Sequence, residues 1–405
     1  MLNTFPDFIA TISKFSPRVL SASHTAIKRR ISVLSDFDYS VYEHRDFIFS
    51  QIEPIFTLIL TIHDSNLDYT RQSLNSVFSQ SYLNTEVIIV SHGATGLTLD
   101  LLTNYFLKNK NSKLILVTNN QYSPFDGDFN NAVVNLWNAA LFCSVGNFVY
   151  FMSYDDLISI NYVERMVLLF IANSSCVTAS PNILSINEDG ILNAKTNELL
   201  ASRNKRRRYT NGVVLAWDFM KGGDLILFPG GLLAHNSDLV LELGGFDICS
   251  DHSQIFKFAI CGDSGFDPEA SLFWRHHSQQ TNKLVKQLGA VHFSSYGTFL
   301  TDYSIFNLHA KFGGTVFARE FSIYFKKLIY ESAIGSFRDS YRLYGFVSGF
   351  NAFKRLIDEC PFDLVLKVPP YLIIDSLSCV YHSLPESLKR TYRRLKNLFF
   401  LLLRN

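Results

Sequence analysis

Short, almost continuous apolar runs alternate along residues 54–156 with stretches in which apolar residues recur every three or four positions. The first pattern predicts buried β-strands, and the second predicts amphipathic helices. Alternation of the two at this spacing predicts an α/β fold, with a doubly wound, mainly parallel sheet flanked by helices and joined by right-handed crossovers. The predicted strands are 55–62, 86–90, 113–118 and 147–154, and the predicted helices are one that carries Leu74, Val77 and Phe78, one near 97–107 and one near 133–144.

The last of these apolar runs ends in two adjacent carboxylates, Asp155 and Asp156. In open α/β sheets the ligand crevice lies at the carboxyl ends of the strands. Two hard oxygen ligands at that edge suit a divalent cation that carries a nucleotide diphosphate. The local pattern is equally compatible with a pair that only caps the next helix, whose apolar face holds Val163, Met166, Val167 and Phe170.

Both ends of the chain predict helical extensions, so we divide it into residues 1–50, 51–299 and 300–405. In the first, Phe8, Ile9, Ile12 and Phe15 recur at helical spacing before the basic cluster 28–30. Such a helix docks either on the main domain or on an anionic membrane surface. The last region ends in the basic stretch 389–396 and the apolar stretch 398–403, which either contact a membrane or pack onto the N-terminal helices.

Composition narrows the class of protein. With 405 residues and 47% hydrophobic content, the chain has enough apolar material for a large core. The net charge of +1 gives no general attraction for nucleic acid. Its six cysteines are far apart and show no zinc-binding spacing, which is typical of free thiols in a reducing compartment. No apolar run reaches the roughly 20 residues that cross a bilayer, and no secretory signal is visible. We therefore expect a cytoplasmic protein that is soluble or peripheral at the inner membrane face.

Several motifs follow one another in an order that resembles family 2 glycosyltransferases of the GT-A fold. The resemblance spans roughly residues 54–282 and rests on the whole ordered set, because each motif alone is weak. The motifs are TIHD at 61–64, LNSVFSQSY at 74–82, EVIIV at 86–90, WNAAL at 137–141 with Gly146 after it, YDD at 154–156, GGFD at 244–247, SDHSQIFKF at 250–258 and FWRHH at 273–277.

This resemblance implies an inverting transfer of a hexosyl or related sugar from a nucleotide-sugar to a glycan or lipid-linked acceptor, in cell-surface polysaccharide assembly. It implies Asp251 as the general base, although Asp251 could equally be only a helix N-cap. It implies Asp155 and His277 as ligands of Mn²⁺ or Mg²⁺; a histidine packed beside an aromatic wall is the other interpretation of His277. The implied nucleotide-sugar-binding residues are Asp64, Ser91, Asn138, Asp155, Asp156, Arg275 and His277.

The chain departs from the family pattern at two carboxylate positions. Ser153 replaces the first Asp of the Asp-x-Asp motif, and a hydroxyl is a poorer ligand for a hard cation. Ser91 and His92 stand where the family has an Asp that accepts the imide N–H of uracil, which leaves the donor base open. The basic run 203–208 either contacts phosphate in compensation or is a solvated, lipid-facing loop.

These departures motivate a second hypothesis, a degenerate relative that binds a glycan or a partner enzyme without catalysis. A third hypothesis, a nucleotidyltransferase on a similar sheet, is weaker. Such enzymes generally have a glycine-rich and basic loop after the first strand, and residues 61–64 form no such loop.

Overall fold

The computed structural model describes residues 18–21, 38–44, 48–63, 66–117, 129–203, 207–221, 233–246, 254–278 and 309–324. The chain forms two compact units, one of residues 1–276 with 311–313 and one of residues 277–310 with 314–405. Among the described residues, no helix is both long enough and apolar enough to cross a membrane.

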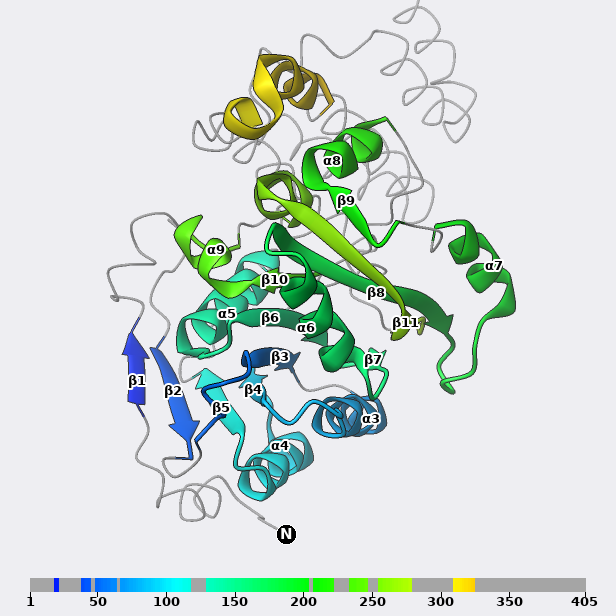
Figure 1. Cartoon of the computed structure of the whole chain (residues 1–405). Coiled ribbons are helices and arrows are strands. Elements are labelled where there is room, and N and C mark those ends of the chain that lie inside the picture. Colours follow the sequence, from blue (N-terminus) through cyan, green and yellow to red (C-terminus); the bar gives the residue numbers. More distant parts are fainter. Residues whose placement is uncertain are drawn as a thin grey trace, which may run out of the picture. The chain divides into compact units, whose positions relative to one another are not determined.

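One sheet of eleven strands organises the described part of the first unit (Figure 1). Its order is β1-β2-β5-β4-β3-β6-β10-β8-β11-β7, and β9 pairs with β11. The pairs β5–β4, β4–β3, β3–β6 and β8–β11 are parallel, and the others are antiparallel. The strands are β1 (Arg18–Ser21), β2 (Asp38–Glu43), β3 (Phe56–Ile62), β4 (Thr85–Ser91), β5 (Ser112–Val117), β6 (Phe148–Ser153), β7 (Leu157–Ile158), β8 (Cys176–Ile186), β9 (Tyr209–Asn211), β10 (Ala234–Asn236) and β11 (Asp263–Arg275).

Helices cover both faces of this sheet, as the alternating pattern predicts. Successive residues of β3 point to opposite faces, so Leu58 and Leu60 pack with α3, α4 and α6 while Ile59 packs with α5 and α9. The doubly wound, mainly parallel α/β fold is therefore confirmed. The helices are α3 (Leu67–Phe78), α4 (Gly96–Lys108), α5 (Phe129–Cys143), α6 (Tyr162–Ala172), α7 (Ala194–Arg203), α8 (Gly212–Met220), α9 (Ser237–Glu242), the π-helix η1 (Gln254–Phe258) and the 3₁₀-helix η2 (Ala259–Cys261).

The N-terminal extension contributes two strands where we predicted helical structure. β2 pairs antiparallel with β5, so that Val41 lies opposite Ile115 and both are fully buried. β1 in turn pairs with β2. Only the free edge of β5 makes a strand favourable at 38–43, because its unpaired backbone groups need a partner. The predicted helix around residues 8–15 lies outside the described residues.

Of the second unit, the structure describes residues 277–278, 309–310 and 314–324. Residues 309–324 are helical, and the ring of His309 meets those of Phe317 and Phe321 at centroid distances of 5.4 and 4.0 Å. Most of the predicted helical region 300–405 lies outside the described residues.

A buried ion pair joins the amino ends of the central strands. Glu86 on β4 is 1% exposed and lies 2.8 Å from the ammonium of Lys113 on β5. Its carboxylate also accepts hydrogen bonds from the Thr57 hydroxyl at 2.6 Å and the Val145 N–H at 2.9 Å. Lys113 donates to the Cys143 carbonyl at 2.6 Å. Because every partner belongs to a different strand or loop, this pair ties β3, β4, β5 and the end of α5 together.

A fully buried histidine, His235 on β10, lies in an aromatic environment. Its ring meets the rings of Phe246 and Phe258 edge-on, at centroid distances of 5.6 and 5.3 Å. Burial lowers the pKa of His235 to about 3, and the neighbouring Gln254 side chain opposes this shift only in part. The native state therefore keeps this imidazole neutral.

We expect the free energy of unfolding to fall in mild acid because of His235. Below pH 6.5 the unfolded chain binds a proton at this position and the native state does not, so stability is lost as pH falls. From pH 7 to pH 5 this group alone should cost about 2 kcal/mol. Urea denaturation at both pH values measures the loss, and a His235→Leu variant should lose that much less than the wild type. Equal pH dependence in the two proteins would contradict the prediction.

Candidate active site

The carboxyl ends of three parallel strands bring the candidate residues to one edge of the sheet. Ile62 of β3 pairs with Ser91 of β4, and the His92 N–H donates to the Ile62 carbonyl at 2.8 Å. The ring of His63, just after β3, lies 4.8 Å from the ring of Tyr154, just after β6. The structure thus places Ser91 and the acid pair at the same edge, where α/β sheets bind ligands.

The imidazole that replaces a family carboxylate is held in its neutral form. His92 is 9% exposed, and burial lowers its pKa. The neighbouring imidazole of His63 lowers it further, because two protonated imidazoles would repel each other. A neutral imidazole both donates and accepts a hydrogen bond, whereas a carboxylate only accepts. His92 therefore offers a different hydrogen-bonding pattern from a carboxylate.

The two carboxylates lie in the turn between β6 and β7. Asp155 is 9% exposed, and Asp156 accepts the Arg275 N–H at 3.0 Å. Burial raises the pKa of Asp156 well above its usual range, and the neighbouring charge of Asp155 raises it further. The next helix, α6, has Asn161 at its N-cap position, so the acid pair does not cap it. The capping interpretation of Asp155 and Asp156 is therefore wrong.

Arg275, the last residue of β11, lies beneath this turn and is fully buried. Its Nε donates to the Asp155 carbonyl at 2.8 Å, and its Nη2 donates to Oε1 of Gln72 at 2.7 Å. Its Nη1 donates to the Glu188 carbonyl at 2.9 Å. The guanidinium also lies 4.6 Å from the ring centroid of Tyr69. Arg275 therefore reaches the acid pair from the protein interior.

Asn138, another residue of the predicted donor-binding set, contacts a glycine turn. Its amide accepts the Phe246 N–H at 2.8 Å and donates to the Phe246 carbonyl at 3.0 Å. The turn needs glycine, because Gly244 and Gly245 have φ angles of 85° and 79°. Lys257 donates to the Gly245 carbonyl at 2.8 Å. Asn138 and Lys257 thus hold the GGFD motif from two sides.

Other predicted site residues are not placed with this edge. Asp64 and Asp251 lie outside the described residues. His277 is buried and belongs to the second compact unit. Of the basic run 203–208, Arg207 and Arg208 are exposed, and the Arg208 carbonyl accepts the Phe266 N–H at 2.8 Å. The phosphate contact proposed for this run stays a prediction.

Metal binding at this edge would depend on the substrate. Within the described ranges, no three Asp, Glu, His or Cys side chains form a cluster that could hold a metal. Mg²⁺ and similar cations are often held by one or two carboxylates together with substrate phosphates. Asp155 fits that arrangement as a single carboxylate beside the substrate phosphates, whereas the raised pKa of Asp156 favours its neutral acid form.

Tyr69 and Gln72 contact Arg275 but belong to no recognisable sequence motif. Tyr69 and Gln72 lie in the first half of α3, which begins after the N-cap Asn66. The sequence holds one signal for these two residues. They are three positions apart on a predicted helix, so their side chains lie on the same face of it.

Comparison with known proteins identifies the domain around this edge. Residues 57–224 match the family model described as "Glycosyl transferase family 2". The chain carries a family 2 glycosyltransferase domain with the GT-A fold. The resemblance seen in the motifs is confirmed.

The relatives of this family 2 domain support the same assignment. Two proteins of Haemophilus influenzae, both described as "Uncharacterized glycosyltransferase", are 27% and 24% identical over 133 and 125 residues, or 33% and 31% of this chain. The matched segments span only 38% and 46% of those two proteins. A solved structure of S. aureus TarS 1–349, in complex with UDP-GlcNAc, shares the fold at 14% identity with a TM-score of 0.50, covering 84% of this chain and 92% of that one.

Proposed function

We propose that this protein transfers a hexosyl or related sugar, with inversion, from a nucleotide-sugar to a glycan or lipid-linked acceptor. The observation that carries the proposal is the acid pair Asp155–Asp156 at the carboxyl edge of a family 2 sheet. The ends of β3 and β4 lie beside that pair, which is where α/β sheets of this kind bind nucleotides. A role in cell-surface polysaccharide assembly fits a transferase with such acceptors.

The donor would lie along this edge with its diphosphate against the acid pair. We assign Asp64, Ser91 and His277 to the lining of the nucleotide-sugar pocket. Asn138 and Arg275 would serve the pocket from beneath, because both are buried and hold the Phe246 and Asp155 segments through their backbone groups. When bound, Mn²⁺ or Mg²⁺ neutralises charge on the departing diphosphate, and Asp155 and His277 are the residues that we assign to hold it. The basic run 203–208 is a further source of positive charge for the diphosphate.

Asp251 is the base that we assign to the acceptor. Its carboxylate takes the proton of the attacking hydroxyl while the hydroxyl oxygen forms a bond to the anomeric carbon. The bond between that carbon and the phosphate oxygen breaks on the opposite face, and its electron pair leaves with the nucleoside diphosphate. Attack from the opposite face inverts the configuration at the anomeric carbon.

Lipid-linked acceptors would bring the protein to the inner face of a membrane. The basic clusters 28–30 and 389–396 are the segments that we expect to contact anionic headgroups, each cation contributing about 1 kcal/mol. Both clusters lie outside the described residues, so their membrane contact stays a prediction.

A non-catalytic glycan-binding or enzyme-binding relative is the second candidate. Ser153 at the end of β6 and Ser91–His92 at the end of β4 occupy two positions where the family has carboxylates. Loss of both carboxylates would weaken metal and uracil recognition together.

Binding of nucleotides separates the two candidates. We expect one nucleotide-sugar from a panel of UDP, GDP, dTDP and CMP sugars to raise the melting temperature in the presence of Mn²⁺. A ligand at a hundredfold excess over its dissociation constant adds about 2.7 kcal/mol to the free energy of unfolding. A metal-independent shift would favour charge neutralisation by the run 203–208. No shift with any nucleotide would favour the non-catalytic relative.

A further inference from the structure

One guanidinium connects three segments that are far apart in the sequence. Arg275 donates to the Asp155 carbonyl in the β6–β7 turn, to the Gln72 side chain on α3, and to the Glu188 carbonyl in the turn after β8. A weaker contact reaches the Asn187 carbonyl at 3.4 Å. Its main-chain N–H also donates to the carboxylate of Asp156 at 3.0 Å. The turn that carries the acid pair is thus held at both of its aspartates by one residue.

The burial of Arg275 makes these contacts costly to lose. Its side chain is fully buried, so any N–H or carbonyl left without a partner would keep its desolvation penalty. The planar guanidinium presents several N–H donors in fixed directions, which lets one residue bind three oxygens at once. A lysine has a single charged atom and cannot span the same three acceptors.

A bulge in β11 determines where Arg275 falls. β11 pairs in parallel with β8, but the register shifts between Asp267, opposite Pro181, and Ser271, opposite Asn182. Three extra residues are therefore accommodated in β11 between these two pairs. In a strand, a slip of one residue moves every following side chain to the opposite face of the sheet. The bulge thus decides that Arg275 points toward the acid pair.

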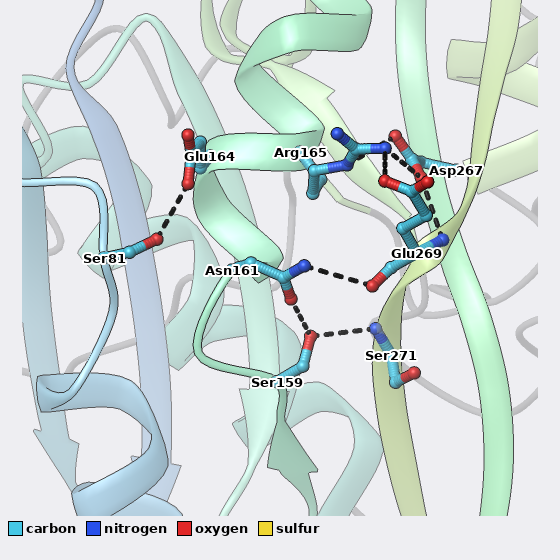
Figure 2. Close-up of polar contacts among 8 residues, drawn as sticks. All are labelled: Ser81, Ser159, Asn161, Glu164, Arg165, Asp267, Glu269 and Ser271. Carbon is cyan, nitrogen blue, oxygen red and sulfur yellow. Dashed lines mark hydrogen bonds and ion pairs between the residues drawn. The ribbon is translucent and has the colours of Figure 1, made fainter.

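Side chains at the start of α6 hold this bulge (Figure 2). Arg165 lies 3.0 Å from the Asp267 carboxylate and also forms an ion pair with Glu269. The Asn161 amide donates to the Glu269 carbonyl at 3.1 Å, and the Ser271 N–H donates to the Ser159 hydroxyl at 2.9 Å. These residues follow the acid pair directly in the chain, so the same segment that bears Asp155 and Asp156 also determines the position of Arg275.

We propose that Arg275 is a positioning residue that holds the Asp155–Asp156 turn against α3 and the turn at 187–188. It contacts Asp155 through the main-chain carbonyl. The role of this contact in sugar transfer rests on the proposed function. The contact itself does not, so the two can be tested separately.

Amide hydrogen exchange tests the positioning role without any assay of activity. We expect residues 153–158 to exchange about tenfold faster in the Arg275→Ala variant, with Arg275→Lys between that variant and the wild type. Millimolar guanidinium chloride should restore protection in Arg275→Ala, because the free cation can occupy the vacated site. Arg71→Ala, which removes an exposed pair with Asp68 on α3, should leave these rates unchanged. Unchanged exchange at 153–158 in Arg275→Ala would overturn the proposal, as would faster exchange spread evenly over β3 and β4 that guanidinium does not reverse.

Nucleotide binding then tests whether the position of the Asp155–Asp156 turn matters for the proposed function. With Mn²⁺ present, we expect UDP or GDP to bind Arg275→Ala about 10²-fold more weakly than the wild type, because the acid pair is misplaced. Guanidinium should recover part of that loss. Weakened binding that guanidinium does not recover would count against positioning. If the wild type binds neither nucleotide, the proposed function loses its support, while the exchange experiment still decides the role of Arg275.

Discussion

The Asp251→Asn variant should lose about 10³-fold in turnover and still bind the nucleotide-sugar. An amide cannot take the proton of the attacking hydroxyl, and general base catalysis commonly contributes 10²–10⁴-fold, so the expected loss is about the middle of that range. Asn is nearly the same size as Asp, so the donor pocket should keep its shape. Single-turnover kinetics with the donor identified by the panel measure the loss, and calorimetry measures donor binding.

An exposed aspartate supplies the control for Asp251. Asp238 in the first turn of α9 is exposed, and Asp238→Asn should retain nearly full turnover. Near-normal turnover in Asp251→Asn would remove Asp251 from the mechanism. Equal losses in donor binding and turnover would instead assign Asp251 to donor binding.

The Glu86→Gln variant should lose about 3–5 kcal/mol in the free energy of unfolding. The substitution leaves the Lys113 ammonium, whose side chain is 12% exposed, without its charged partner 2.8 Å away. It also weakens the acceptor of the Thr57 hydroxyl and the Val145 N–H. Urea denaturation at pH 7 measures the loss.

Two further variants separate the buried charge from general effects of substitution. Glu43 lies 3.9 Å from Lys113 and is 39% exposed, so Glu43→Gln should cost at most about 1 kcal/mol. Adding Lys113→Met to Glu86→Gln removes the ammonium that has lost its buried partner and should restore part of the stability. A double variant no more stable than Glu86→Gln alone would show that the hydrogen bonds to Thr57 and Val145, and not the ion pair, carry the loss.

Replacement of the family's carboxylates at the nucleotide edge changes the chemistry that this site offers. Burial and the neighbouring imidazole of His63 lower the pKa of His92, which favours its neutral form, and a neutral imidazole can both donate and accept. Ser153 leaves Asp155 and Asp156 as the carboxylates at the end of β6. The nucleotide panel with and without Mn²⁺ therefore tests the two properties that these substitutions are expected to change, the choice of base and the need for metal.

The central strands and the acid pair could be predicted from the sequence because their determinants are local. Residues 55–62 are almost entirely apolar, with two threonines, and residues 87–90 are apolar throughout. Short runs of this kind are typical of strands that are buried on both faces. Asp155 and Asp156 end such a run, so their place at the carboxyl edge follows from the direction of the strand. No partner elsewhere in the chain is needed for these predictions.

Only the tertiary structure shows which groups Arg275 and Asn138 bind and that residues 38–43 form a strand. Arg275 and Asn138 bind main-chain groups of Asp155, Glu188 and Phe246, and every residue has such groups, so no pattern of side chains reveals the partners. Residues 38–43 become a strand because β5 presents an open edge, a property of the assembled sheet. Local periodicity thus specifies which segments are strands, whereas pairing at an edge and hydrogen bonds to the backbone exist only after distant segments have packed together.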